Sequence, residues 1–316
     1  MRTILFLLVW LAAATSWAEE APATVAMQAL QVGEHTWYVQ GQTGAVTAEN
    51  QGFMSNAGFV VTEEGVLVVD ALGTRPLARK LLELIRRVTD KPIKIVVVTH
   101  YHADHYYGLQ VFEEAGAKIW AHERGQDVLR SDGVQERLKQ RREALAPWIG
   151  EDFRIVPAHV WLAGDTDFTF GGLHFLLRHV GPAHSAEDMA LLVVEDGVLF
   201  AGDLVFKDRV PFVGDADSRA WLASLDKLTV LRPQVMVPGH GAHSDQPAQD
   251  LKLTRDYLVY LRARMGQAVA EFTPFDEAYA KTDWSEFETL PAFADANRRN
   301  AYNTYLLLER EALEKK

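Results

Sequence analysis

Short apolar runs rich in β-branched residues alternate along this chain with longer segments in which apolar residues recur every three or four positions. Residues 58–70 contain two such runs around a Glu-Glu-Gly turn, and residues 94–98 contain a third that is too short for a helix. Residues 75–89, between them, have the apolar spacing of an amphipathic helix. The pattern predicts an α/β protein in which buried strands alternate with helices.

The strand–turn–strand pattern of residues 58–70 occurs a second time at residues 191–203. Gly65 aligns with Gly197 in the two turns, and each copy ends in an aspartate. Such an internal repeat predicts two similar half-domains whose β-sheets face each other. Further strands are predicted at residues 36–39, 118–121, 167–170, 173–180 and 234–237, and further helices at residues 106–115, 123–146 and 218–231. The alternating charges of residues 123–146 indicate a solvated face.

From about residue 251 the apolar spacing is helical to the end of the chain, with breaks at Pro274 and Pro291. We therefore expect an α/β domain over residues 19–262 and a helical C-terminal extension over residues 263–316. The sequence leaves two arrangements of this extension open, because it can pack on the α/β domain or lie in a contact between two copies of the chain. It predicts no oligomeric state.

The first residues have the pattern of a secretory signal peptide. Arg2 precedes an apolar run at residues 4–14, and the small residues Ser16 and Ala18 follow it. We expect residues 1–18 to be removed by cleavage after Ala18, leaving a periplasmic or secreted protein without stable membrane insertion. The alternative, an uncleaved anchor, is disfavoured because the apolar run is short for a bilayer span.

Composition excludes some functions and some ligands. The chain has 43 acidic and 32 basic residues, for a net charge of −11, which argues against a nucleic-acid partner. It contains no cysteine. Disulfides are therefore impossible, and any metal site must use nitrogen and oxygen ligands.

Four potential metal ligands follow the strand predicted at residues 94–98: His100, His102, Asp104 and His105. Alternate residues of an extended chain point the same way, so His100 and His102 can bind one ion together. Asp104 and His105 come after the chain turns and can face a second ion. Because isolated loop histidines rarely gather in this way, the cluster predicts a metal site.

The motif Thr-His-Tyr-His-Ala-Asp-His at residues 99–105 resembles the His-x-His-x-Asp-His signature of the metallo-β-lactamase-fold hydrolases. Four further pieces follow the order of that superfamily: Asp70 after a strand, His184 in Gly-Pro-Ala-His-Ser, Asp203 in Phe-Ala-Gly-Asp-Leu and His240 in Val-Pro-Gly-His-Gly. The resemblance spans roughly residues 30 to 260. It implies an αβ/βα sandwich of two facing mixed β-sheets flanked by helices, with the site at the sheet ends.

The resemblance also implies ligands and roles. One ion would be held by His100, His102 and His184, and a second by Asp104, His105 and His240, with Asp203 bridging them. Two Zn²⁺ ions are expected, with iron or manganese as alternatives, and a bridging hydroxide would be the nucleophile. Asp104 would orient the hydroxide and carry the proton, and Asp70 would accept a hydrogen bond from a ligating imidazole or cap the following loop.

The expected reaction is hydrolysis of an ester, thioester, amide or lactam of a small-molecule substrate. The chain resembles glyoxalase-II-like hydrolases and a periplasmic group linked to sulfur oxidation and quinoproteins. Two other classes stay open. One is a mononuclear iron persulfide dioxygenase, which shares much of the motif string, and the other is a non-catalytic periplasmic binding protein that retains a metal.

Five residues are candidates for the substrate cleft. Phe53 and Met54 lie in a polar loop, residues 41–56, and either form an exposed lid or tuck onto their own core. Tyr101 lies between two ligands, Lys207 lies four residues after Asp203, and His243 lies three after His240. For these three, ordinary packing or solvent exposure is the simpler interpretation.

Overall fold

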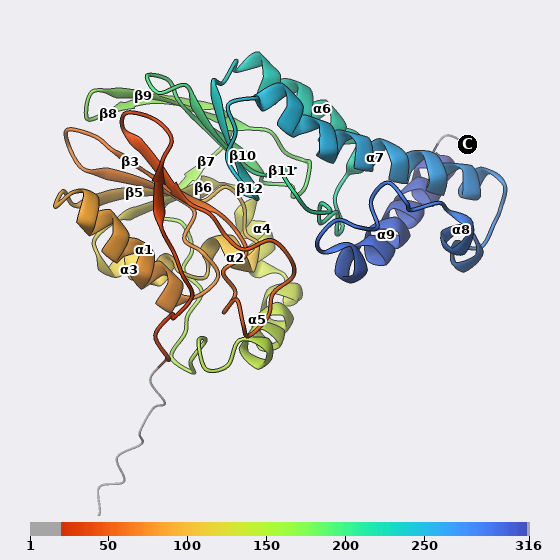
Figure 1. Ribbon diagram of the computed structural model, residues 1–316, viewed down its shortest axis with the longest axis horizontal. Coiled ribbons are helices and arrows are strands. Elements are labelled where there is room, and N and C mark those ends of the chain that lie inside the picture. The colour runs from red at the N-terminus through yellow and green to blue at the C-terminus, as the bar shows by residue number, and fades with distance from the viewer. Residues whose placement is uncertain (1–19, 315–316) are drawn as a thin grey trace, which may run out of the picture.

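The computed structural model describes residues 20–314, so the predicted signal peptide lies outside the described residues. Two β-sheets pack face to face, and helices cover their outer faces (Figure 1). The predicted sandwich of two mixed sheets flanked by helices is therefore confirmed. None of the helices in residues 20–314 is long and apolar enough to cross a membrane.

The first sheet has seven strands in sequence order, with antiparallel pairing from β1 to β4 and parallel pairing from β4 to β7. Its strands are β1 (Ala29–Gln31), β2 (Thr36–Val39), β3 (Ala57–Val61), β4 (Val66–Val69), β5 (Ile93–Val97), β6 (Lys118–His122) and β7 (Val160–Leu162). The sequence pattern did not reveal β1 and β7, because three residues carry too little periodicity.

The second sheet has five strands in the order β12-β11-β10-β9-β8. They are β8 (Thr166–Phe170), β9 (Leu173–His179), β10 (Met189–Val193), β11 (Val198–Phe206) and β12 (Val235–His240), and only β11 and β12 pair in parallel. The repeated hairpins are thus β3–β4 in one sheet and β10–β11 in the other, as the internal repeat predicted.

Both faces of the central strands are buried, and alternation divides their side chains between two cores. In β4, Leu67 and Val69 point into the core between the sheets, whereas Val66 and Val68 pack under the outer helices. In β11, Phe200 faces the inner core and Leu199 the outer one. Burial on both faces explains why these strands have continuous apolar runs instead of alternating polarity.

The helices over the first sheet are α1 (Arg75–Val88), α2 (Ala103–Tyr106), α3 (Leu109–Glu114), α4 (Gly125–Arg130) and α5 (Asp132–Ala144). The helix predicted at residues 106–115 is shorter than expected, because α3 begins only at Leu109. It follows Gly108, which passes so close to the chain that a Cβ would lie 1.9 Å from Ala71 O. Residues 123–146 break at Ser131, whose backbone is extended.

The second sheet is covered by α6 (Ser218–Val230) and α7 (Pro247–Ala270), followed by α8 (Phe275–Lys281) and α9 (Phe293–Glu314) (Figure 1). The expected domain boundary after residue 262 falls inside α7. One apolar core runs continuously from Trp221 of α6 through Leu261 of α7 to Phe287 and Tyr305 in the extension. The extension packs on the α/β domain, which is one of the two arrangements left open.

Candidate active site

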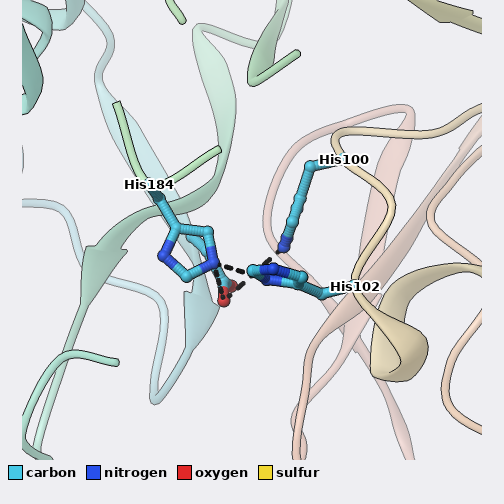
Figure 2. A group of neighbouring side chains, drawn as sticks. His100, His102 and His184 are labelled. Carbon is cyan, nitrogen blue, oxygen red and sulfur yellow. Dashed lines mark hydrogen bonds and ion pairs between the residues drawn. The ribbon is translucent and has the colours of Figure 1, made fainter. Parts of the chain in front are cut away.

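Seven side chains from both halves of the sandwich converge at one end of the sheets. His100, His102, Asp104 and His105 follow β5, His184 lies between β9 and β10, Asp203 lies within β11, and His240 ends β12. Figure 2 shows the imidazoles of His100, His102 and His184 directed toward a common point. The expected ligand residues are therefore brought together, although Asp203 lies inside its strand and not at the end.

Asp203 stands between two groups of donors. Its Oδ2 lies 3.3 Å from His184 Nε2 and 3.8 Å from His100 Nε2. Its Oδ1 lies 3.1 Å from His105 Nε2 and 3.3 Å from His240 Nε2. One carboxylate thus presents one oxygen to each group, which is the arrangement that a bridging ligand requires.

The remaining donors complete the two groups. His102 Nδ1 lies 2.7 Å from His184 Nε2, beside the His100 side of the cluster. Asp104 Oδ2 lies 3.4 Å from His240 Nε2 and 3.7 Å from His105 Nε2. Within each group the donor atoms all lie within 4.8 Å of one another.

The donor atoms fit a divalent cation because several of them are buried and unsatisfied. His100 Nε2, His105 Nε2 and Asp203 Oδ1 are buried and have no hydrogen bond of acceptable geometry in the described chain, even though two of them lie 3.1 Å apart. Buried polar atoms normally have partners. Imidazole nitrogens and carboxylate oxygens are ligands that Zn²⁺ and several transition metals accept.

Neighbouring groups fix which nitrogen faces the cluster in three of the imidazoles. His105 Nδ1 donates to Asp70 Oδ2 at 2.8 Å, and His240 Nδ1 donates to Met54 O at 2.7 Å. His100 Nδ1 lies 3.1 Å from Thr99 Oγ1. With Nδ1 engaged, the lone pair at Nε2 of each ring is free for a metal.

Burial and charge set the protonation of the ligands. Burial lowers the pKa of His100 and His102 well below the usual value and that of His184 to about 4. Burial opposes ionisation of Asp203, but His240 and His105 outweigh it and hold the pKa of Asp203 well below its ordinary range. Neutral imidazoles and an ionised carboxylate are the forms that bind a metal.

His105 differs from the other imidazoles of the cluster. Burial disfavours its cationic form, but Asp203, Asp70 and Asp104 together raise its pKa well above the usual value. The three carboxylates around the His105 ring therefore favour a positive charge beside it, which a bound cation would supply.

Asp70 occupies the place that the sequence indicated, directly after β4. Its carboxylate accepts hydrogen bonds from Thr99 N and Thr99 Oγ1, each at 2.8 Å, as well as from His105 Nδ1. Its backbone is left-handed, with φ of 61°. Asp70 thus connects the end of β4 to the loop that carries the histidine motif, which combines the two roles expected for it.

Two contacts near β12 were not found by sequence reasoning. A Cβ on Gly239 would lie 2.0 Å from Asp203 Oδ1, so only glycine lets β12 pass the shared carboxylate. Asn56 Nδ2 donates to Pro238 O and Gly241 O, each at 2.8 Å, and Asn56 N donates to Gly239 O at 2.7 Å. The Pro-Gly-His motif was visible in the sequence, but nothing there linked it to Asn56.

A cavity of about 180 Å³ opens on the cluster. It reaches His102, Asp104, Asp203 and His240, and its other lining residues are Ala45, Val46, Met54, Arg137, Arg141, Arg209, Phe212, Ala292, Asp295 and Ala296. The loop before β3, helix α5, the loop after β11 and the C-terminal extension all contribute. This cavity is the candidate substrate site, because it is concave and reaches ligands of both groups.

Of the five expected cleft residues, only Met54 lines this cavity. Phe53 is 1% exposed and belongs to the core under the first sheet, so it is not part of an exposed lid. Tyr101 is buried edge-on against Tyr106, with ring centroids 5.0 Å apart. Lys207 Nζ pairs with Asp250 at 3.1 Å, and His243 Nδ1 lies 3.0 Å from Tyr38 Oη.

Three arginines that sequence reasoning did not select line the cavity: Arg137 and Arg141, one turn apart on α5, and Arg209 after β11. None of the three has an ion pair with any residue in the described part of the chain. Arg209 is 3% exposed and donates to Gly44 O at 2.7 Å. The charges of residues 123–146 therefore face the cavity at two positions instead of being only solvated.

Comparisons with known proteins agree with this geometry. The sequence profile of the metallo-beta-lactamase superfamily matches residues 50–240. The chain is 27% identical over 239 residues to a linear primary-alkylsulfatase of Pseudomonas sp., covering 64% of this chain but 45% of that protein. It is 23% identical over 221 residues to the metallo-beta-lactamase type 2 of Bacillus cereus, covering 68% of this chain and 77% of the other.

Solved structures share the fold at low sequence identity. A metallo-beta-lactamase from Pontibacter korlensis has a TM-score of 0.60 and 23% identity, with 74% of this chain and 99% of the other covered. The sec-alkylsulfatase Pisa1 from Pseudomonas sp. has a TM-score of 0.63 and 18% identity, with 89% and 50% covered. The chain thus spans about half the length of both alkylsulfatases.

The profile match covers more than half of the chain and includes the four-ligand motif, His184, Asp203 and His240. Together with the two-sheet fold, it shows that this chain belongs to the metallo-beta-lactamase superfamily, as the sequence motifs implied.

Proposed function

We propose that this protein is a binuclear zinc hydrolase whose substrate is a small ester that carries a negative charge. The observation that carries the proposal is the position of Asp203, which presents one oxygen to each of two donor groups. A shared carboxylate between complete ligand sets favours two ions over the single iron of a persulfide dioxygenase. The N-terminal sequence supports action in the periplasm.

In this proposal His100, His102 and His184 hold one ion, Asp104, His105 and His240 hold the other, and Asp203 contacts both. When bound, two zinc ions supply a hydroxide at neutral pH and polarise the oxygen of the group under attack. Asp70 orients His105 through the 2.8 Å contact between its Oδ2 and His105 Nδ1.

Asp104 is the candidate proton carrier because it lines the cavity and lies beside both His105 and His240. Burial opposes its ionisation, but His105 and His240 lower its pKa to about 2 overall, which gives the anionic form that a metal ligand needs. A carboxylate at this point can accept a proton from the attacking water and pass it to the leaving group. No other carboxylate reaches both the donor groups and the cavity in the described chain, apart from Asp203.

The three cavity arginines indicate that the substrate is an anion. Although the protein has a net charge of −11, three guanidinium groups without ion-pair partners in the described chain line this one cavity. Guanidinium groups bind sulfate, phosphate and carboxylate through paired N–H donors. Phe212, Val46 and the cavity alanines offer apolar surface for the rest of the molecule. An alkyl sulfate combines these features, and the alkylsulfatase relative supports it as the first compound to test.

The test uses purified protein with its zinc content measured. Initial rates are compared for 4-nitrophenyl sulfate, 4-nitrophenyl acetate, a primary alkyl sulfate and a chromogenic cephalosporin. The two nitrophenyl esters share a leaving group, so the ratio of their rate enhancements over the uncatalysed reactions reports the preference for an anionic ester. We expect two zinc ions per chain, a preference for sulfate esters, and a loss of more than about 100-fold in the Asp203→Asn variant.

Other outcomes assign the other candidate classes. Preferential cleavage of the cephalosporin would place the protein with the β-lactamases. A single iron per chain with oxygen consumption on a persulfide would make it an oxygenase. Protein with two zinc ions that cleaves none of the esters or lactams would contradict the proposal.

A further inference from the structure

The C-terminal extension supplies one wall of the cavity. Ala292, Asp295 and Ala296 line the cavity directly, at the start of α9. Next to them lies a segment between β11 and α6, residues 209–216, which carries Arg209 and Phe212 into the cavity. We call this segment the wall loop.

The wall loop has no helix or strand of its own and is held by the extension. Val210 N donates to Pro291 O at 3.0 Å. Asn303 Nδ2, on α9, donates to Gly214 O at 2.8 Å. A loop without regular structure keeps one conformation only where contacts of this kind offset its conformational entropy.

Asn300 makes the central contact. Its Oδ1 accepts from Val213 N at 2.9 Å, and its Nδ2 donates to Pro211 O at 2.7 Å. These two backbone groups flank Phe212, so one side-chain amide holds the chain on both sides of the aromatic residue. A third hydrogen bond joins Asn300 Nδ2 to Tyr257 Oη of α7 at 3.0 Å.

The position of Phe212 follows from this attachment. Its ring centroid lies 6.3 Å from the rings of His102 and His184. The Arg299 guanidinium, on α9, lies over the same ring, 5.6 Å from its centroid. The side chain of Asn300 is fully buried, which makes its hydrogen bonds costly to lose.

We propose that Asn300 is a positioning residue for substrate binding, acting through the wall loop. The inference rests on the proposed function only in taking the cavity as the substrate site. Releasing the residues on either side of Phe212 lets both Phe212 and Arg209 move relative to the ligand cluster. Displacements of about an ångström are enough to weaken binding and alignment. The candidate metal ligands lie on other segments, and His240 keeps its hydrogen bond to Met54 O when its 3.3 Å contact with Arg209 Nη1 is lost.

Asn297 provides a matched control on the same helix. It is as fully buried as Asn300 and belongs to the same polar network, accepting from Tyr257 Oη at 2.8 Å and donating to Tyr279 Oη at 3.0 Å. None of its hydrogen bonds reaches the wall loop. Replacing either asparagine by leucine therefore disturbs the extension similarly, but only Asn300→Leu releases the loop.

The experiment compares Asn300→Leu, Asn297→Leu and the parent protein by zinc content, hydrogen exchange of residues 209–216 and steady-state kinetics on the best substrate found. For Asn300→Leu we expect unchanged zinc, exchange in the wall loop at least about tenfold faster, and KM raised about five- to tenfold with kcat within twofold. For Asn297→Leu we expect a similar fall in Tm but KM and loop exchange within twofold of the parent.

Equal effects of the two variants on KM, or unchanged exchange of the wall loop in Asn300→Leu, would overturn the inference. If Asn300→Leu does not fold, Asn303→Ala replaces it, since Asn303 is only partly buried and holds the loop at Gly214. Failure of the proposed function is recognised separately, because then the parent protein itself hydrolyses no compound.

Discussion

At the scale of single residues, the site depends on side chains that touch ligands without being ligands. Asp70 is the clearest case, because its two oxygens receive hydrogen bonds from the Thr99 amide, the Thr99 hydroxyl and His105 Nδ1. Aspartate and asparagine are among the few residues that tolerate its left-handed backbone. Asp70→Asn can therefore preserve the fold while removing the charge beside His105.

We predict that Asp70→Asn weakens zinc binding by the Asp104–His105–His240 group about 10- to 100-fold and leaves the other group nearly unchanged. The reason is that a neutral amide no longer favours the Nδ1–H form of His105 or increases its basicity. Stepwise zinc release to a chelator of known affinity measures the effect. If the substitution weakened both steps of zinc release equally, this prediction would be wrong.

Asp196→Asn is the control for this substitution. The Asp196 carboxylate, in the turn between β10 and β11, accepts hydrogen bonds from His35 N and Thr36 Oγ1 at the start of β2, and neither hydrogen bond involves a candidate ligand. The same chemical change there should alter stability without altering either step of zinc release.

At the scale of elements, α5 contributes charge to the cavity from a helix that is otherwise polar and half-exposed. Arg137 and Arg141 lie one turn apart and face the cavity, whereas Lys139 between them is exposed and does not line it. A helix places residues four apart on one face and the residue midway between them on another. Substitutions at the three positions can therefore distinguish an effect of charge inside the cavity from an effect of the protein's total charge.

We predict that Arg137→Gln and Arg141→Gln each raise KM for an anionic ester about three- to tenfold and leave KM for 4-nitrophenyl acetate unchanged. Lys139→Gln removes the same charge and should change neither value. Steady-state kinetics at low and high salt measure these KM values. The differences in KM between the variants should become smaller at high salt, because ionic screening increases. If Lys139→Gln raised KM for the anionic ester as much as the two arginine variants do, there would be no specific anion site on α5.

The sequence could reveal those elements and residues that a short stretch of the chain identifies by itself. Most strands and helices were predictable, because burial on one face leaves an apolar period in the chain and burial on both faces leaves a continuous apolar run. The donor cluster was predictable because His100 to His105 lie close together in the sequence and the other candidate ligands lie in short motifs. Arg137 and Arg141 were not, because charges on a polar helix look alike until the fold shows which face meets the cavity. Phe53 and Met54 are neighbours, yet only the fold shows that one turns into the core.

At the scale of the whole molecule, the ligand cluster joins two half-domains with separate outer cores. Asp104 and His105 belong to the half built on the first sheet, whereas His240 and Asp203 belong to the half built on the second. Each proposed ion therefore contacts side chains from both sheets, and Asp203 contacts both groups. Metal binding should act as a link between the halves in addition to its chemical role.

We predict that removing zinc with a chelator lowers Tm of the whole protein by about 5–10 °C, because a ligand present at about 100 times its Kd stabilises the folded state by about 2.7 kcal/mol. Adding zinc back should restore Tm, whereas magnesium should not, since it prefers oxygen ligands and the cluster is mainly imidazole. Calorimetry of the zinc-loaded, chelated and reconstituted protein measures this. In Asp203→Asn the gain from zinc should be smaller, because the residue that joins both groups has lost its charge. Identical Tm values with and without two bound zinc ions would show that the cluster does not link the half-domains energetically.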